Sequence, residues 1–233
     1  MSNSEGSSPL PKSGTDMITA DFSQQISYKS LAQELNALLE GKGQVLVGVD
    51  GCGGSGKSTF ARKLEAVGGD RFVVVEMDDF YKPSTERNEQ TAAAISGDFD
   101  WERVRSQVLE PLHSGKNGSY QRYDWNHDAL AEFHDLPYGT IVIIEGVGST
   151  RDELARFYDM RVWVDCAAKT RLNRGLVRDG EEARSKWVDK WMPAENRYVE
   201  AHRPFARATF LVKGDPEQTP PEGHYLASER TGN

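Results

Sequence analysis

The stretch VLVGVDGCGGSGKSTFARKL, residues 45–64, decides the fold of this chain. It starts with apolar, β-branched residues, passes four glycines within six positions, and continues in a helix-forming pattern. Glycine at this density costs conformational entropy on folding, so the backbone must be needed here for a specific purpose. Residues 51–58 fit the pattern G-x-x-x-x-G-K-[S/T] between a predicted strand and a predicted helix, which is typical of a phosphate-binding P-loop.

A P-loop surrounds phosphates with its backbone N–H groups, and the following helix N-terminus adds donors and a favourable dipole. Close contact between backbone and phosphate would account for the glycines. Lys57 is expected to bridge the β- and γ-phosphates of ATP, and the Ser58 hydroxyl to bind Mg²⁺. A flexible turn that fits the pattern by chance is the alternative, and the flanking strand and helix argue against it. The predicted phosphate-binding residues are Gly51, Gly53, Gly54, Ser55, Gly56, Lys57, Ser58 and Thr59.

Short apolar segments alternate with helical patterns along most of the chain. Apolar runs at 44–50, 71–80, 139–147, 160–166 and 208–214 are typical of strands buried on both faces. This alternation predicts a three-layer α/β/α domain with a five-stranded parallel sheet. We expect the kinase-like domain to span 23–214, between a disordered tail at 1–22 and a polar, proline-containing tail at 215–233.

Carboxylates follow two of these predicted strands. Asp78 and Asp79 end the second strand, and Glu145 ends the third. Ligands of parallel sheets bind beyond the carboxyl ends of the strands, where these side chains would meet the P-loop. We predict that Asp78 orients or deprotonates an acceptor hydroxyl and that Glu145 holds the Mg²⁺ water shell; a capping role for Asp78 and a surface strand end at Glu145 are the alternatives.

The composition excludes several classes of protein. The net charge is −8 and the sequence pI about 5.2, which argues against nucleic acid or an anionic membrane as a partner. No apolar run is long enough for a transmembrane helix, and the N-terminal residues do not resemble a secretory signal. The two cysteines, Cys52 and Cys166, are too few for a disulfide framework, so we predict a cytoplasmic protein that acts on a small molecule, either alone or as a homo-oligomer.

Among P-loop proteins the sequence favours the small-molecule kinases. It lacks the N-K-x-D pattern of GTPases and the LSGGQ-type signature of transporter ATPases. Arg171, Arg174 and Arg178 lie three and four residues apart, on one face of a predicted helix. That face could close over ATP phosphates as a lid, or it could be an ordinary solvated helix face.

At these residues the chain resembles the P-loop kinases that phosphorylate uridine and cytidine, phosphoribulose or pantothenate, with the uridine kinase branch nearest. DDFY (78–81) resembles the D-x-F-Y motif, which implies that Asp78 is the base and Tyr81 contacts the acceptor. DFDW (98–101) and YDWNH (123–127) resemble acceptor-binding segments, which implies that Asp100, Tyr123 and His127 contact a nucleoside. RLNRGLVRD (171–179) resembles the lid motif, which implies nucleotide contacts for Arg171 and Arg178 and a catalytic role for Arg174.

The chain departs from the family pattern mainly on the acceptor side. His127 follows Tyr123 by four residues instead of five, Trp101 replaces a histidine, and Gly175 replaces the second arginine of an adjacent pair. The resemblance implies an ATP- and Mg²⁺-dependent kinase acting on a hydroxyl, with a pyrimidine nucleoside as the expected acceptor. Pantothenate, a sugar or a sugar phosphate is the alternative acceptor. A nucleotide-binding regulatory protein without phosphotransfer is the alternative of another class.

Trp187 and Trp191 are four residues apart, so they share one face of a predicted helix. Packing in a helix core is one interpretation of this pair, and lining of an acceptor pocket is the other.

Overall fold

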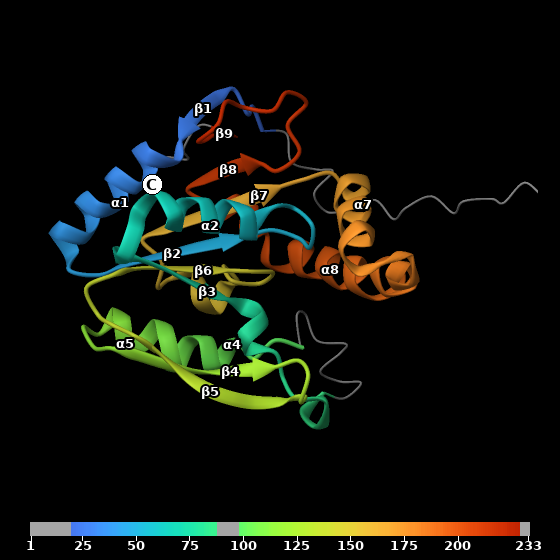
Figure 1. Cartoon of the computed structure of the whole chain (residues 1–233), viewed down its shortest axis with the longest axis horizontal. Coiled ribbons are helices and arrows are strands. Elements are labelled where there is room, and N and C mark those ends of the chain that lie inside the picture. The colour runs from blue at the N-terminus through green and yellow to red at the C-terminus, as the bar shows by residue number, and fades with distance from the viewer. Residues whose placement is uncertain (1–19, 88–97, 229–233) are drawn as a thin grey trace, which may run out of the picture.

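The computed structural model describes residues 20–87 and 98–228, and its centre is a seven-stranded sheet (Figure 1). The spatial order of the strands is β1-β9-β8-β7-β2-β6-β3. Their bounds are β1 Gln24–Ser27, β2 Val45–Asp50, β3 Phe72–Glu76, β6 Ile141–Glu145, β7 Met160–Asp165, β8 Phe210–Lys213 and β9 His224–Ala227.

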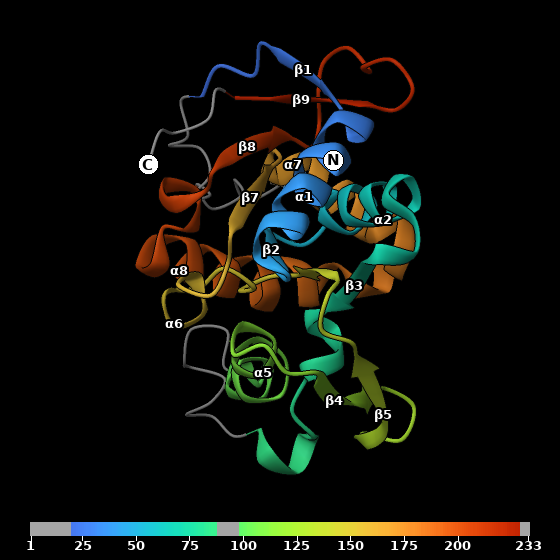
Figure 2. The same cartoon turned by 90° about the vertical axis from the view of Figure 1, so that its left-hand side faces the viewer.

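The five predicted parallel strands are present as β2, β3, β6, β7 and β8, each paired in parallel with its neighbours among them. The predicted strand count of five is wrong, because β1 and β9 extend the sheet beyond β8 in antiparallel pairing. Figure 2 shows the two added strands side by side at one edge. The polar segment after residue 214, predicted to be a tail, therefore returns to the sheet through β9, while residues 1–19 of the predicted N-terminal tail lie outside the described residues.

Helices cover both faces of the sheet, as the three-layer prediction requires. Their bounds are α1 Tyr28–Lys42, α2 Lys57–Gly68, α4 Trp101–Arg103, α5 Glu110–His113, α6 Asp152–Ala155, α7 Ala168–Asp179 and α8 Met192–His202. A π-helical segment, Val104–Leu109, joins α4 to α5, and a second one, Lys186–Trp191, precedes α8. No helix of residues 20–87 and 98–228 has the length and apolar character needed to cross a bilayer.

Alternation along β2 explains why both faces are covered. Val45, Val47 and Val49 pack with α1 and α2 in one cluster, whereas Leu46 belongs to the cluster formed with the helix at 101–113. Every residue of β2 is buried, so this strand presents apolar side chains to two layers at once. A separate two-stranded sheet, β4 (Gly118–Asp124) and β5 (Ala129–Leu136), packs beside that second layer; the sequence did not predict it.

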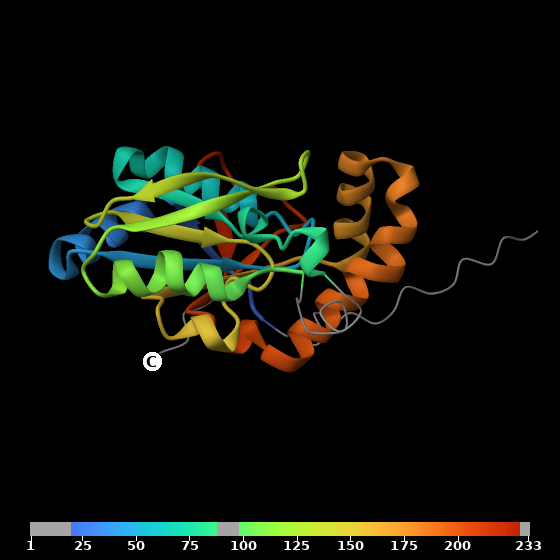
Figure 3. The ribbon, with the colours of Figure 1, turned by 90° about the horizontal axis from the view of Figure 1, so that it is seen from below.

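The strands end beneath a helical projection. In Figures 1 and 3, α7 and the start of α8 stand at the side of the molecule toward which the parallel strands point. The P-loop, residues 51–56, connects β2 to α2 on this side. The P-loop glycines, the carboxylates Asp78 and Glu145 near the strand ends, and the lid motif (171–179) therefore lie at the same side of the molecule.

Candidate active site

Three adjoining cavities lie along the P-loop. The β8–β9 cavity, about 580 Å³, lies between α2 and the segment that links β8 to β9; the P-loop cavity, about 230 Å³, lies over residues 54–59. The tryptophan cavity, about 450 Å³, holds Trp125, Trp187 and Trp191 in its wall. The first two share Gly56, Thr59 and Arg174, and the last two share Lys57 and Arg178, so the three cavities lie next to one another along the P-loop.

The P-loop glycines are needed by the protein's own packing as well as by any phosphate. A Cβ on Gly54 would lie 2.6 Å from the carbonyl oxygen of Arg171, and the residue has φ +74°. A Cβ on Gly53 would lie 2.8 Å from Glu195 and 3.0 Å from the Trp187 ring. Segments more than 100 residues away in sequence therefore press against the loop and require glycine there.

Lys57 and Ser58 begin α2, and Gly56 caps it in a left-handed conformation at φ 102°. The α2 N-terminus leaves unpaired N–H groups toward the P-loop cavity, as an anion site requires. Lys57 lies in both the P-loop cavity and the tryptophan cavity, and its charge opposes the rise in the pKa of Asp78 and of Glu145. Lys57 thus faces both the expected phosphate position and the carboxylates at the strand ends.

The end of β6 offers a fitting environment for Mg²⁺. Glu145 is buried, and its Oε2 has no hydrogen-bond partner among the described residues. Burial raises the pKa of Glu145, while Lys57 and a hydrogen bond from Ser58 lower it. No group of three or more metal-binding side chains occurs in residues 20–87 and 98–228, so an ion held by Ser58 and Glu145 would need phosphate oxygens and water as its other ligands.

Asp78 stands where the tryptophan cavity meets the P-loop. Its carboxylate is open to solvent through the cavity, yet the surrounding protein partly desolvates it and raises its pKa, with Lys57 opposing the rise. The neighbouring Asp79 turns the other way and accepts a hydrogen bond from Tyr120 Oη at 2.9 Å. Only Asp78 of the two therefore lines the cavity.

We expect the acid limb of the rate profile to report this carboxylate. A base must be ionised, so turnover falls as the pH drops through the pKa of Asp78, and the raised pKa places this fall above the ordinary value of 3.8. The measurement is kcat/KM for the acceptor across the acidic range. A limb with its midpoint at or below 3.8 would contradict the assignment.

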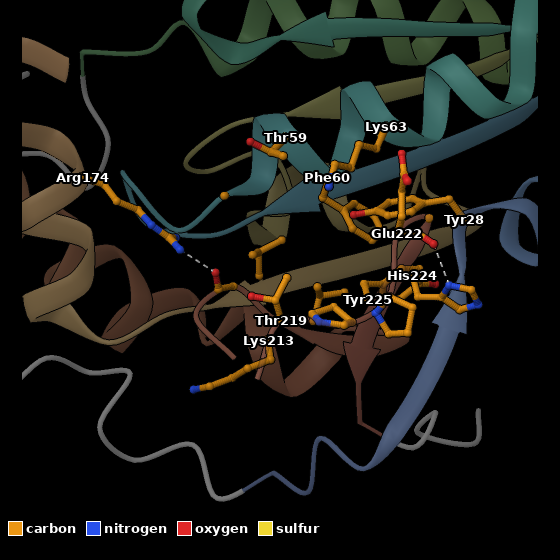
Figure 4. Close-up of a pocket in the computed structure, with 17 residues that line it drawn as sticks. Tyr28, Thr59, Phe60, Lys63, Arg174, Lys213, Thr219, Glu222, His224 and Tyr225 are labelled. Carbon is orange, nitrogen blue, oxygen red and sulfur yellow. Dashed lines mark hydrogen bonds between the residues drawn. The ribbon is translucent and has the colours of Figure 1, made fainter. Parts of the chain in front are cut away.

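The three lid-motif arginines have different surroundings. Arg171 has a fully buried side chain and pairs with Glu195 at 2.9 Å, so it lies behind the P-loop and lines none of the three cavities. Arg174 donates to the carbonyl oxygens of Gly54 (3.2 Å) and Gly214 (2.9 Å). Figure 4 shows its side chain at one end of the β8–β9 cavity. Arg178 lines two of the cavities, and its side chain is mostly exposed to solvent. It forms an ion pair with its neighbour Asp179 at 2.6 Å.

The predicted acceptor residues separate into two groups. Tyr81 lines the tryptophan cavity, where its hydroxyl donates to Asp98 at 3.0 Å. Asp100 instead caps α4 and pairs with Arg103 at 3.1 Å, and Tyr123 is buried with its hydroxyl bonded to Asp128 at 2.5 Å. His127 is largely exposed and pairs with Asp124, away from the cavity.

Residues that the motif comparison did not single out take those places in the wall. Asp98, Phe99 and Trp125 line the tryptophan cavity, each one or two residues from a predicted position. Trp125 lies 4.6 Å from Tyr81 between ring centroids. The motifs located the right segments, but local backbone geometry decides which of their residues face the cavity.

Comparison with known proteins identifies the family. The family model described as "Phosphoribulokinase / Uridine kinase family" matches residues 46–207.

The chain belongs to this family.

It is therefore a P-loop kinase. A uridine kinase of Brevibacillus brevis is 30% identical over 204 residues, covering 81% of this chain and 92% of the relative. A uridine kinase of Deinococcus deserti is 33% identical over 144 residues, covering 59% of this chain and 69% of the relative. A structure described as a possible uridine kinase from Bacillus stearothermophilus covers 78% of this chain and 98% of that one, with a TM-score of 0.58 and 22% identity, and supports the fold.

One departure of this kinase from its family pattern has a packing reason. Gly175 replaces an arginine, and the Trp187 ring fills the space above it, since a Cβ at 175 would lie 2.3 Å from the ring. Trp187 is buried, donates from Nε1 to Asp179 at 2.9 Å, and lines the tryptophan cavity. Both interpretations of the tryptophan pair therefore apply to Trp187, which packs a helical core and forms a cavity wall.

Gly175→Ala is expected to destabilise the kinase by about 1–3 kcal/mol, because the added methyl overpacks a site where the ring has little room to move. Trp187 is confined by Gly53 on one side and by its hydrogen bond to Asp179 on the other. The measurement is the free energy of unfolding in urea. Gly41→Ala, on α1 with nothing within 4 Å of its added Cβ, is the matched control and should be neutral or slightly stabilising, and equal behaviour of the two variants would contradict this packing argument.

Proposed function

We propose that this kinase transfers the γ-phosphoryl group of ATP to a hydroxyl of a nucleoside, most simply a pyrimidine nucleoside, in a reaction that uses Mg²⁺. The row of three adjoining cavities along the P-loop is the observation that carries the proposal. A nucleotide base in the β8–β9 cavity, phosphates in the P-loop cavity and an acceptor in the tryptophan cavity would bring the γ-phosphoryl group next to Asp78.

The β8–β9 cavity suits a flat base. Residues Thr219 to Tyr225 form one wall, including Pro220 and Pro221, while Phe60 and Lys63 of α2 form the other (Figure 4). Tyr28, Phe60 and Tyr225 form a buried aromatic cluster behind it, with ring centroids 5.0–5.4 Å apart. Arg174 stands between this cavity and the P-loop cavity, close to where base and phosphates would join.

The tryptophan cavity suits an acceptor with a ring. Tyr81, Phe99 and Trp125 form one aromatic wall, and Trp187 and Trp191 form another. Aromatic walls bind flat, partly apolar rings better than an open-chain acid, which favours a nucleoside over pantothenate. The names of the relatives, uridine kinases, support the same acceptor class.

The chemistry is an in-line transfer. The acceptor oxygen forms a bond to the γ-phosphorus while the bond from that phosphorus to the bridging oxygen of ADP breaks, and Asp78 takes the hydroxyl proton. Lys57, with Arg178 released from Asp179, would neutralise charge on the moving group, and the P-loop N–H groups would hold the phosphates. Mg²⁺ bound by Ser58, with Glu145 beside it, would neutralise phosphate charge.

The test is ADP release from Mg-ATP in the presence of uridine, cytidine, purine nucleosides, pantothenate or sugars. We expect uridine or cytidine to stimulate release. Stimulation by pantothenate or a sugar alone would overturn the nucleoside assignment and keep the kinase. ATP binding without stimulation by any acceptor would favour the regulatory nucleotide-binding protein instead.

A further inference from the structure

Glu195 connects the P-loop to the helical projection. Its Oε1 accepts a hydrogen bond from the Gly53 backbone N–H at 2.7 Å, and its Oε2 accepts one from Arg171 Nη1 at 2.9 Å. Glu195 lies on α8 and Arg171 on α7, so three separate segments meet at this carboxylate. Neither the P-loop pattern nor the lid motif singles out Glu195.

Stability alone does not explain the pair. Arg171 is fully buried, and two of its nitrogens, Nε and Nη2, have no hydrogen-bond partner among the described residues. A buried ion pair repays the desolvation of its charges only when the remaining donors are also satisfied, and apolar residues of similar volume are often as stabilising or more so. The pair therefore has a cost that a role in positioning would justify.

The position of the pair suggests what is positioned. Gly53 is in the middle of the P-loop, and its N–H is directed to α8 by the bond to Glu195. The next residue, Gly54, rests against the Arg171 backbone, because a Cβ at position 54 would lie only 2.6 Å from the Arg171 carbonyl oxygen. Arg171 thus contacts the P-loop directly with its backbone. Its side chain holds Glu195, which in turn accepts a hydrogen bond from the loop.

The negative charge of Glu195 is compensated by the buried guanidinium of Arg171. A carboxylate next to a polyphosphate site would repel the ligand unless a cation compensates it. Arg171 supplies the compensating charge from the buried side, so Glu195 can accept from Gly53 without opposing phosphate binding. Glu195 also lines the tryptophan cavity beside Trp187, so the acceptor and phosphate regions share this support.

We propose that Glu195, held by buried Arg171, is a positioning residue that fixes the Gly53 peptide and so keeps the P-loop in its nucleotide-binding conformation. The proposal rests on the proposed nucleotide site and concerns how that site is held in shape. It assigns Arg171 to the support of the loop, in place of the direct nucleotide contact that the lid motif implied.

The test replaces the pair by apolar residues of similar volume, R171M/E195L. We expect the double variant to unfold at a temperature near or above that of wild type, since no buried charge is left unpaired. We expect its affinity for ADP, titrated calorimetrically without acceptor, to fall about tenfold, because Gly53 has lost a charged hydrogen-bond acceptor. A purely structural pair would leave affinity unchanged once stability is restored.

Glu195→Gln gives a second measurement should the double variant not fold. Gly53 and Arg171 donate to different oxygens of Glu195, and glutamine replaces one of these oxygens by an NH₂ group that cannot accept, so we expect a smaller loss of ADP affinity, of about threefold. Glu200→Gln, an exposed position on the same helix, is the matched control and should bind ADP as wild type does. Wild-type affinity in the folded R171M/E195L or in E195Q would overturn the proposal, whereas a wild-type protein that does not bind ADP would overturn the nucleotide site itself.

Discussion

Asp78→Asn is expected to lower turnover by about 10² or more while the affinity for ATP stays close to that of wild type. Asparagine keeps the size and polarity of the side chain but cannot take the proton of the acceptor hydroxyl. Asp78 lines the tryptophan cavity and lies beside the P-loop lysine, whose charge acts on its pKa. The measurement combines steady-state turnover with nucleotide binding followed by calorimetry.

Asp79→Asn is the matched control for this prediction. The two aspartates are adjacent, but Asp79 accepts a hydrogen bond from Tyr120 at 2.9 Å and does not line the cavity. An asparagine oxygen can still accept that bond, so we expect turnover within a few-fold of wild type. Unaltered turnover in Asp78→Asn would remove Asp78 from the role of base.

Lys57→Ala is expected to weaken nucleotide binding and to lower turnover by about 10²–10³, the range typical for removing one group that stabilises transition-state charge. Lys57 lines both the P-loop cavity and the tryptophan cavity, so its loss affects both bound phosphates and the phosphoryl group in transfer. Calorimetric titration with ATP and steady-state rates separate the two effects.

Lys29→Ala, at an exposed position on α1, controls for the simple loss of a positive charge. It should change neither binding nor turnover, because surface charges far from the site are screened by solvent and salt. If Lys57→Ala also changed neither property, the assignment of residues 51–58 as a phosphate-binding loop would fail.

Local sequence patterns were enough to predict the parallel part of the sheet and the location of the candidate active site. Five strands could be recognised because each contains a short apolar run; β2 and β6 are buried along their whole length, while β3 and β8 are only partly buried. The P-loop, Asp78 and Glu145 could be placed relative to one another because parallel strands end at the same edge of the sheet. These inferences need only local pattern and a general rule of topology.

The two antiparallel edge strands, β1 and β9, could not be predicted from local patterns. β1 and β9 are four residues each, QQIS and HYLA, and lie in polar surroundings of the sequence, so neither stands out as an apolar run. They pair with each other across about 200 residues of sequence, Gln24 opposite Ala227. Hydrogen bonding to a distant edge stabilises such strands, and no local pattern records that partner.

Only the tertiary structure shows what the charged and aromatic side chains of the site contact. Arg171 and Arg178 are on one helix and fit one motif, yet Arg171 is buried against Glu195 and Arg178 is exposed beside Asp179. Trp187 occupies the space above Gly175, so the glycine at this position is explained only by the ring packed on it. Spacing specifies which residues share a helix face, but the neighbours packed on that face determine whether a charged group meets solvent, a ligand or a buried partner.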